Sequence, residues 1–161
     1  RSNGWLEFRR VLFRSAEKNK VILIEKNEKL GKKLYITGKG RCNITSSKSI
    51  EEFFDYIPGN PSFLYSALYT FSNENTKQFF EDAGVNLKTE RGDRVFPVSD
   101  KSSDIICALE NKLREKNVTI LKNSTVKNVN FKNNKITNVV LNNDTQILGD
   151  YFIFWERKSV V

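Results

Sequence analysis

Glu25 is the first residue of the chain whose position indicates a chemical role. It follows the apolar run VILI at residues 21–24 and precedes a basic segment that contains glycines. In dinucleotide-binding folds, an acid at the end of such a strand accepts hydrogen bonds from ribose hydroxyls, because the strand end faces the cofactor crevice. An ordinary solvated glutamate would give the same pattern. Glu25 alone therefore leaves both interpretations open.

The segment GKKLYITGKGRCN at residues 31–43 combines glycines with cations. Gly31, Gly38 and Gly40 permit a close backbone approach or a positive φ angle. Four basic side chains suit a pyrophosphate; they are Lys32, Lys33, Lys39 and Arg41. The segment is not a Walker A loop, because Gly40 stands where that motif has a Ser or Thr to ligate magnesium. We expect a loop with room for one helical turn. Its composition leaves two interpretations open, a ligand-binding loop and a loop that binds nothing.

Composition excludes several kinds of site. The 161 residues include no histidine, which removes Ser/His/Asp and Cys/His nucleophile arrangements and histidine zinc sites. The two cysteines, Cys42 and Cys107, match no metal-ligand spacing, and we expect both to be reduced. Any chemistry must therefore come from a cofactor or from carboxylates, and we expect no metal.

Apolar residues at helical spacing predict four helices, which must position these groups. They are expected at residues 50–54, 63–71, 73–83 and 102–116. Gly84 should end the third helix and Ser102 should cap the fourth. The residues expected to face the core are Phe63, Leu64, Ala67, Leu68, Phe71, Gln78, Phe79, Phe80, Ala83, Ile105, Ile106, Leu109 and Leu113.

Strand signals occur at both ends of this helical stretch. Residues 21–24 predict a buried strand of the parallel type, and residues 85–95 predict a short hairpin around Arg91-Gly92-Asp93. Further strands are expected at residues 118–121, 125–131, 135–141 and, as a last buried strand, 151–154. Asn133 and Asn134 tolerate positive φ and suit a two-residue hairpin turn. The sequence thus predicts an α/β fold with a parallel sheet, a helical excursion and a β-meander.

The two ends of the chain look foreign to this pattern. Residues 6–15, LEFRRVLFRS, back-translate into a sequencing-library adapter, and residues 157–161, RKSVV, resemble its companion. We expect residues 1–15 and 155–161 to be adapter-derived; the alternative is a natural basic amphipathic tail. Without them, 21 Lys and Arg face 17 Asp and Glu, a net charge of +4 in place of +8. The chain has no methionine, and we expect a piece of a longer protein.

Two blocks of the sequence resemble a known family. They are VILIEKNEKLGKKLYITGKGRCNIT at residues 21–45 and GDRVFPVSDKSSD at residues 92–104. They resemble signatures of the BaiN/RdsA family of NAD(P)/FAD-dependent oxidoreductases, also known as aminoacetone-oxidase-like FAD-binding enzymes. The family's second block is GRVFPVSDKASD, so Gly-Asp-Arg replaces Gly-Arg here. The resemblance covers nearly all of residues 16–154 and implies a partial FAD-binding Rossmann-type domain that is truncated at both ends.

The resemblance also implies roles for particular residues. Glu25 would bind the adenosine ribose of FAD, with Lys26 beside it, and the backbone of Val126 would meet the adenine. Residues 31–43 would line the pyrophosphate and approach the isoalloxazine ring. The implied cofactor-binding residues are Glu25, Lys26, Gly31, Lys32, Lys33, Thr37, Gly38, Gly40, Arg41, Cys42, Asn43, Phe96, Pro97 and Val126.

Within that set, Arg41, Cys42 and Asn43 are expected nearest the flavin, and Phe96 and Pro97 near the same crevice. Cys42 has the alternative of being a small packed residue, and Phe96 and Val126 have the alternative of core burial. A complete member of the family begins with a strand and a GxGxxG turn and continues into an Ala-Thr-Gly-Gly stretch. This chain has neither, so we expect the isolated piece to be inactive and to hold FAD poorly.

The resemblance implies a flavoenzyme in which FAD transfers hydride or electrons, with NAD(P)H as reductant and a small molecule as substrate. The competing interpretation is a small basic module that binds nucleic acid through Lys32, Lys33, Lys39 and Arg41. We favour the flavoenzyme and expect no nucleic-acid partner, because the aromatic residues fall on helical apolar faces. No run of residues approaches the length of a membrane span, so we expect no membrane partner and a cytoplasmic protein.

Overall fold

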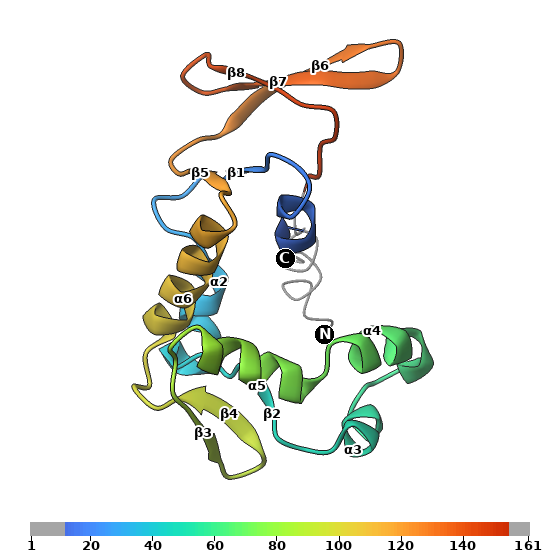
Figure 1. The fold of residues 1–161 in the computed structure, drawn as a ribbon, viewed down its shortest axis with the longest axis vertical. Coiled ribbons are helices and arrows are strands. Elements are labelled where there is room, and N and C mark those ends of the chain that lie inside the picture. Colours follow the sequence, from blue (N-terminus) through green and yellow to red (C-terminus); the bar gives the residue numbers. More distant parts are fainter. Residues whose placement is uncertain (1–11, 155–161) are drawn as a thin grey trace. The chain divides into compact units, whose positions relative to one another are not determined.

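The structure, a computed structural model, describes residues 12–154, apart from the side chains of residues 37 and 38. The chain divides into two compact units (Figure 1). Among the described residues, unit 1 comprises residues 12–21 and 30–118, and unit 2 comprises residues 22–29 and 119–154. The terminal segments expected to be adapter-derived, 1–15 and 155–161, lie outside the described residues except for residues 12–15.

The elements of unit 1, with η for a 3-10 helix, are α2 (Lys32–Ile36), η1 (Thr37–Gly40), β2 (Thr45–Ser46), α3 (Ile50–Asp55), η2 (Pro61–Leu64), α4 (Tyr65–Thr70), α5 (Asn73–Asp82), β3 (Leu87–Glu90), β4 (Arg94–Pro97) and α6 (Ser102–Glu115). The elements of unit 2 are β1 (Ile22–Ile24), β5 (Thr119–Leu121), β6 (Val126–Lys132), β7 (Lys135–Leu141) and β8 (Gln146–Leu148).

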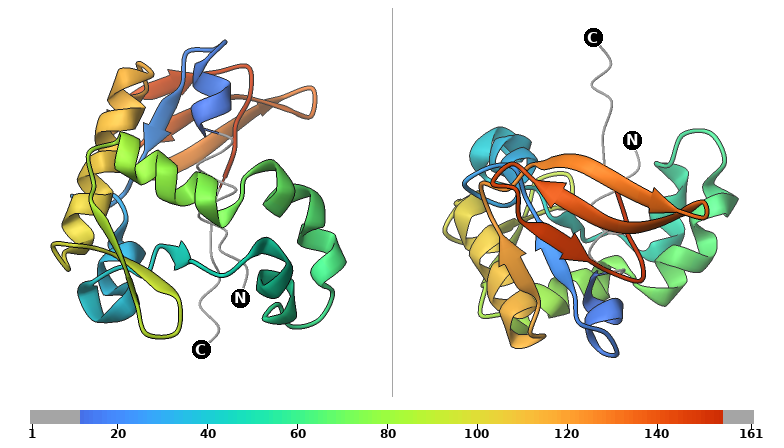
Figure 2. Two further views of the ribbon diagram at one scale, coloured as in Figure 1. Left: turned by 60° about the horizontal axis from the view of Figure 1, so that its bottom comes forward. Right: turned by 90° about the horizontal axis from the view of Figure 1, so that it is seen from above.

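The core of unit 1 forms mainly from α5 and α6, and the C-terminal end of α5 lies beside α6 in Figures 1 and 2. Its buried residues are Cys42, Phe80, Val85, Ile105, Ala108 and Leu109. The four residues predicted as the buried stripe of residues 102–116 are all buried, which confirms that helix. Burying a stripe of this kind is what stabilises an amphipathic helix in water.

The ends of the helices follow their capping residues. Ser72 caps α5 and Ser49 caps α3, each through a reciprocal capping box. Gly84, with φ +80°, follows α5 as predicted. The predicted cap at Ser102 is wrong: Lys101 occupies the N-cap position, and Ser102 is the buried first residue of α6.

Gln78 was expected to face the core and is exposed instead. It precedes Phe80 by two residues, which places it on the opposite side of α5 from that buried ring. Phe79 and Ala83 are half-buried and pack against the core as predicted.

The hairpin predicted at residues 85–95 is confirmed. It is formed by β3 and β4, within a three-stranded antiparallel sheet ordered β2-β4-β3. Leu87 pairs with Pro97, and Thr45 of β2 pairs with Val95. The turn between β3 and β4 has positive φ at Gly92 (78°) and Asp93 (57°). This sheet brings residues 45–46 and 87–97 together in space.

The region from α3 to α4 is helical as predicted but has no buried residue. Phe63 is 80% exposed and Phe71 is exposed, whereas Leu64, Ala67 and Leu68 are half-buried, so the expected apolar face is wrong. Helical spacing shows which residues share a side but not whether another element covers that side. The aromatic rings of α3 and α4 stack on one another instead: the Phe54 and Tyr65 centroids are 5.2 Å apart and those of Tyr65 and Tyr69 are 4.4 Å apart.

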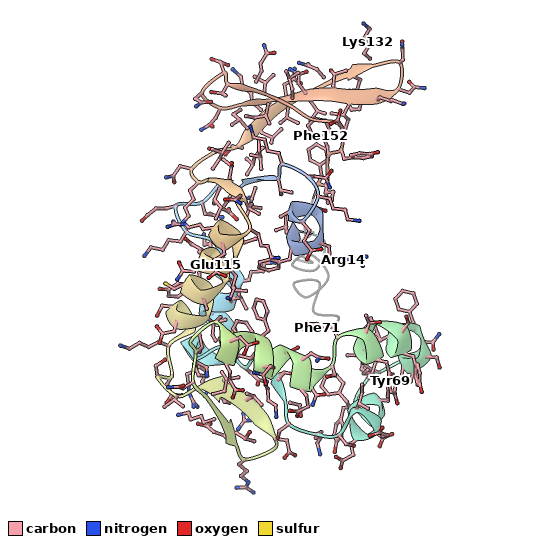
Figure 3. The ribbon with its side chains drawn as sticks, viewed as in Figure 1. Arg14, Tyr69, Phe71, Glu115, Lys132 and Phe152 are labelled. Carbon is pink, nitrogen blue, oxygen red and sulfur yellow. The ribbon has the colours of Figure 1, made fainter. Side chains whose placement is uncertain are left out.

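Unit 2 contains a parallel pair and a meander. β1 pairs in parallel with β5, with Ile22 opposite Thr119, which confirms the parallel type expected for residues 21–24. Those residues are half-buried and not buried, because β5 is the one strand that pairs with β1 in the described residues. The antiparallel meander β6-β7-β8 is visible from above in Figure 2, and Lys132 in Figure 3 marks the end of β6. Its first turn has Asn133 and Asn134 at φ 51° and 58°, as expected.

Two other expectations for the chain are wrong. Residues 31–43 are not mainly a loop, because α2 and η1 occupy residues 32–40 and the glycines at 31 and 40 border these short helices. Residues 151–154 form no strand, and Tyr151, Ile153 and Phe154 are exposed, since no described strand pairs with them. The last strand among the described residues is β8 instead. No described helix has the length and apolar character needed to cross a bilayer.

Candidate functional site

Glu25 lies directly after β1 in unit 2, and hydrogen bonds with Asn27 and with the segment that follows β5 fix its position. Its backbone N–H donates to the Leu121 carbonyl at 2.9 Å, and its carbonyl accepts from the Ser124 N–H at 3.0 Å. Asn27 donates twice to Glu25 Oε1, from its backbone N–H at 2.8 Å and from Nδ2 at 2.5 Å. The Asn123 N–H in turn donates to the Asn27 carbonyl at 3.1 Å. The segments after β1 and after β5 are therefore tied together at this carboxylate.

These hydrogen bonds use Oε1 of the Glu25 carboxylate and leave Oε2 available as an acceptor. Glu25 is half-buried, and within residues 12–154 its Oε2 accepts no hydrogen bond. A half-buried carboxylate oxygen gains from accepting hydroxyl hydrogens, since such groups rarely stay unsatisfied. The other predicted residues of unit 2 are Lys26, which is exposed, and Val126, which is half-buried at the start of β6 opposite Leu141.

The remaining predicted residues lie in unit 1. Gly31 has φ +70°, and a Cβ at this position would meet Ile106 Cγ1 at 3.0 Å. Close packing of α6 thus requires this glycine. Gly40 has φ +87°, and a Cβ there would have the Tyr35 carbonyl oxygen as its nearest neighbour at 3.8 Å, so only the backbone angle requires glycine. Thr37 and Gly38 begin η1, and Lys32, Lys33 and Lys39 are exposed.

Arg41 does not project freely toward solvent. Its Nε and Nη2 donate to Asp100 Oδ1 at 2.7 and 2.5 Å, and Nη2 also donates to Glu90 Oε1. Lys88 Nζ lies 2.7 Å from Asp100 Oδ2 and 3.4 Å from Glu90 Oε1. The guanidinium carbon stands 4.3 Å from the centroid of the Phe96 ring. We call these four charged residues, Arg41, Lys88, Glu90 and Asp100, the Arg41 cluster.

Hydrogen bonding shifts the titration of every member of the Arg41 cluster toward its charged form. The hydrogen bonds from Arg41 hold the pKa of Glu90 below its usual value. Those from Lys88 and then Arg41 lower the pKa of Asp100. The pKa of Arg41 is raised, chiefly by Glu90, and that of Lys88 is raised, chiefly by Asp100. The cluster therefore stays fully ionised and electrically balanced at neutral pH.

The two residues after Arg41 contact unit 1 in different ways: Cys42 is buried, whereas Asn43 is exposed but hydrogen-bonded. Cys42 is 2% exposed, belongs to the core of unit 1 and has φ +60°. With its amide nitrogen oriented to donate, Asn43 donates to the carbonyl of Val95 at 3.2 Å and to that of Thr45 at 3.0 Å. Phe96 and Pro97 are buried. The alternatives considered for Cys42 and Phe96, packing and core burial, describe their positions in this structure.

The structure thus gathers the predicted residues into two groups. Residues 31–43 with Phe96 and Pro97 belong to unit 1, and Glu25, Lys26 and Val126 belong to unit 2. Sequence reasoning missed four residues: Asn27, Lys88, Glu90 and Asp100. Asn27 has a local signal, because an Asn two residues after an acid can hydrogen-bond it. The other three carry none, since they contact Arg41 only through the fold.

The nucleic-acid interpretation depended on four basic residues in one loop. In the structure Arg41 is neutralised by two carboxylates, and three exposed lysines of that set remain. A patch that binds nucleic acid through phosphates needs cations that are free to displace counterions. No observation in the described residues favours that interpretation.

Comparison with known proteins places the chain among related sequences. The model of the family described as "HI0933-like protein Rossmann domain" matches residues 12–155. A 3-dehydro-bile acid delta(4,6)-reductase of Clostridium scindens is 34% identical over 100 residues, which are 62% of this chain and 24% of that protein. The crystal structure of Thermovibrio ammonificans THI4 superposes with a TM-score of 0.48 at 11% identity, over 81% of this chain and 41% of that one. The chain therefore spans about a quarter of the length of the reductase it matches.

Proposed function

This chain belongs to the HI0933-like protein family, in its Rossmann domain, and from that premise we propose that it binds FAD as part of a flavin-dependent oxidoreductase. Glu25 receives the adenosine ribose, and the segment at residues 31–43 receives the pyrophosphate. The complete protein uses NAD(P)H as reductant, acts on a small-molecule substrate and works in the cytoplasm. The observation that carries the proposal is the geometry of Glu25, in a family defined by its Rossmann domain.

The donors and acceptors of unit 2 fit a ribose. Glu25 is half-buried, its Oε2 accepts no hydrogen bond from the described residues, and a ribose diol offers two hydroxyl donors. Asn27 restrains the carboxylate by holding its other oxygen, so the acceptor is oriented before any ligand arrives. A negative charge at this position also disfavours a phosphate on the same ribose, which supports FAD over a 2′-phosphorylated nucleotide.

The segment in unit 1 fits an anion through its exposed lysines. Lys32, Lys33 and Lys39 are exposed and form no ion pair with the described residues. Their charges can neutralise a pyrophosphate without breaking a contact within the protein. When bound, FAD supplies the hydride or electron transfer, and the residues of this chain bind and orient it.

The proposal is tested by titrating FAD against the full-length protein that carries this segment, followed by flavin fluorescence. We expect Glu25→Ala to weaken binding about tenfold or more, since a hydrogen bond to a charged group is worth about 1.5–3 kcal/mol. Glu28→Ala is the matched control, because Glu28 is an exposed carboxyl three residues away. Absence of flavin binding by the wild type, or equal affinities of the two variants, would contradict the proposal.

We also propose that residues 16–154 are the natural part of this chain and that residues 1–15 and 155–161 derive from adapters. The support is that residues 6–15 and 157–161 can both be back-translated into codons that resemble adapter sequences. Amplifying the locus from genomic DNA with primers inside residues 16–154 and sequencing outward tests this. A genome that encodes LEFRRVLFRS immediately before Ala16 would refute it.

A further inference from the structure

Every donor that Arg41 uses in the cluster already has a carboxylate partner. Nε and Nη2 both reach Asp100, and Nη2 also reaches Glu90. One face of the guanidinium lies over the Phe96 ring. A phosphate that bound Nε or Nη2 would have to compete with a carboxylate, and one that bound Nη1 would still stand beside the charges of Glu90 and Asp100. The cluster has two positive and two negative members, so it offers no net attraction to an anion.

The same contacts join three separate segments of unit 1. Arg41 follows η1, Glu90 and Lys88 belong to β3, and Asp100 follows β4. These partners are 49 and 59 residues from Arg41 in the chain. The cluster therefore attaches the turn at residues 40–43 to the β3–β4 hairpin.

That turn needs external restraint because its backbone is unusual. Lys39 and Cys42 have φ of 57° and 60°, a left-handed conformation that costs non-glycine residues free energy and persists only where the surroundings enforce it. The side chains of Arg41, Cys42 and Asn43 all bind or pack within the protein. The contacts of these three side chains therefore set the backbone shape that the turn presents to a ligand.

We propose that Arg41 is a positioning residue, which holds the turn at residues 40–43 in its ligand-binding shape and does not itself bind the pyrophosphate. This inference rests on the proposed function for the identity of the ligand. It assigns the cationic role to the exposed lysines and a restraining role to Arg41. The carboxylates of Glu90 and Asp100 are then needed for binding even though they have the wrong charge for an anion site.

The decisive comparison is between Arg41→Ala and the double variant Glu90→Gln/Asp100→Asn. Both break the cluster, but the double variant leaves Arg41 in place and frees it for a phosphate. Arg94→Ala is the matched control, because Arg94 also lies over Phe96, at 5.8 Å, and forms no ion pair with the described residues. All these side chains are partly exposed, so we expect the variants to fold, which circular dichroism checks.

The first readout needs no cofactor. Amide hydrogen exchange at Cys42, Asn43 and Ile44 is measured in the 161-residue chain; the Ile44 N–H donates to the Val95 carbonyl at 2.9 Å. We expect about tenfold faster exchange in Arg41→Ala and in the double variant, and no change in Arg94→Ala, because local opening sets these rates. Unchanged exchange in both cluster variants would overturn the inference, whether or not the protein binds FAD.

The second readout is the FAD dissociation constant of the full-length protein at about 1 M salt, where a Debye length of about 3 Å screens the general change in charge. We expect both cluster variants to bind FAD about tenfold more weakly, as small displacements of positioning groups do. Tighter binding by the double variant would mean that Arg41 binds phosphate directly. Faster exchange with unchanged affinity would mean that the Arg41 cluster restrains the turn but does not contribute to FAD binding. Either result overturns the inference. A wild type that binds no flavin would instead count against the proposed function.

Discussion

Glu25 is held by Asn27, two residues along the chain, whereas Arg41 is held by Glu90 and Asp100, which are 49 and 59 residues away. The side-chain contact of the first needs only a strand end and one turn, although the backbone around Glu25 also bonds to residues 121–124. The second needs α2, the β3–β4 hairpin and the segment that follows β4 to be in place. Both orient a charged side chain, but one is built from local contacts and the other from long-range contacts.

The difference indicates how the positions of Glu25 in unit 2 and Arg41 in unit 1 should respond to mutations in the core of unit 1. The contact between the side chains of Asn27 and Glu25 closes only a short loop, so it depends on unit 2 and not on the folding of unit 1. A long-range clamp depends on the folding of the whole of unit 1. Perturbing the core of unit 1 should therefore loosen Arg41 before it loosens Glu25.

Removing a core ring of unit 1 has the largest expected effect. Phe80 is 1% exposed, and Phe80→Ala should cost about 3–5 kcal/mol of unfolding free energy through the cavity it leaves. Phe63, which is 80% exposed, provides the control, and Phe63→Ala should change stability by less than about 0.5 kcal/mol. Urea unfolding followed by circular dichroism measures both. Amide exchange in the Phe80 variant should rise more at Asn43, next to Arg41, than at Asn27, which binds Glu25. Equal increases would show that the contacts of Arg41 do not depend more strongly on the core of unit 1 than those of Glu25.

Gly31→Ala should have the next largest effect. It tests the start of the segment at residues 31–43, which contains Arg41. The added methyl would meet Ile106 at 3.0 Å in addition to occupying a positive φ, so we expect a loss of about 2–3 kcal/mol. Gly92→Ala isolates the φ penalty, because no atom lies within 4 Å of its Cβ position, and it should cost about 1 kcal/mol. Thermal unfolding of both variants gives the comparison. Equal losses would show that packing against α6 does not require Gly31.

Acid should weaken the Arg41 cluster by protonating the carboxylates of Glu90 and Asp100. The pKa values of Glu90 and Asp100 are lowered in the folded state, so their contribution to stability is present above the ordinary carboxyl range near pH 4 and is lost as pH falls through their lowered values. Glu90→Gln/Asp100→Asn should therefore have a shallower loss of melting temperature than the wild type between about pH 5 and pH 2. Asp144→Asn, which removes the exposed partner of Lys127, is the control. Parallel curves for the wild type and the double variant would show that the cluster does not stabilise the fold.

The smallest expected effect concerns a purely local feature. Asn134 has φ 58° in the turn between β6 and β7, and Asn134→Gly should stabilise unit 2 by a few tenths to about 1 kcal/mol, because glycine adopts this angle without strain. Asn134→Ala should destabilise by about 1 kcal/mol. Unfolding curves of the pair decide the sign. A destabilising glycine would mean that the Asn side chain contributes to the turn beyond its φ.

The success of sequence reasoning followed the range of the contacts involved. The helix at residues 102–116, the hairpin around residues 91–93 and the turn at Asn133 and Asn134 were predicted correctly, because periodicity and turn chemistry are properties of adjacent residues. The buried face expected for residues 63–71 and the strand expected at residues 151–154 were wrong. Each depended on a second element to cover or pair with it, which the local pattern cannot supply.

The sequence alone determined the kinds of elements, the family resemblance and the position of Glu25 at the end of a strand, since all of these depend on neighbouring residues or on short motifs. Only the tertiary structure decided what Arg41, Cys42 and Asn43 do. Their sequence positions suggested three side chains beside a flavin, and the fold gives each of them a partner in unit 1: carboxylates for Arg41, the core for Cys42 and backbone carbonyls for the exposed Asn43. The physical reason is that a cation takes the nearest well-placed carboxylates, and those of Glu90 and Asp100 come near Arg41 only when the β3–β4 hairpin has folded.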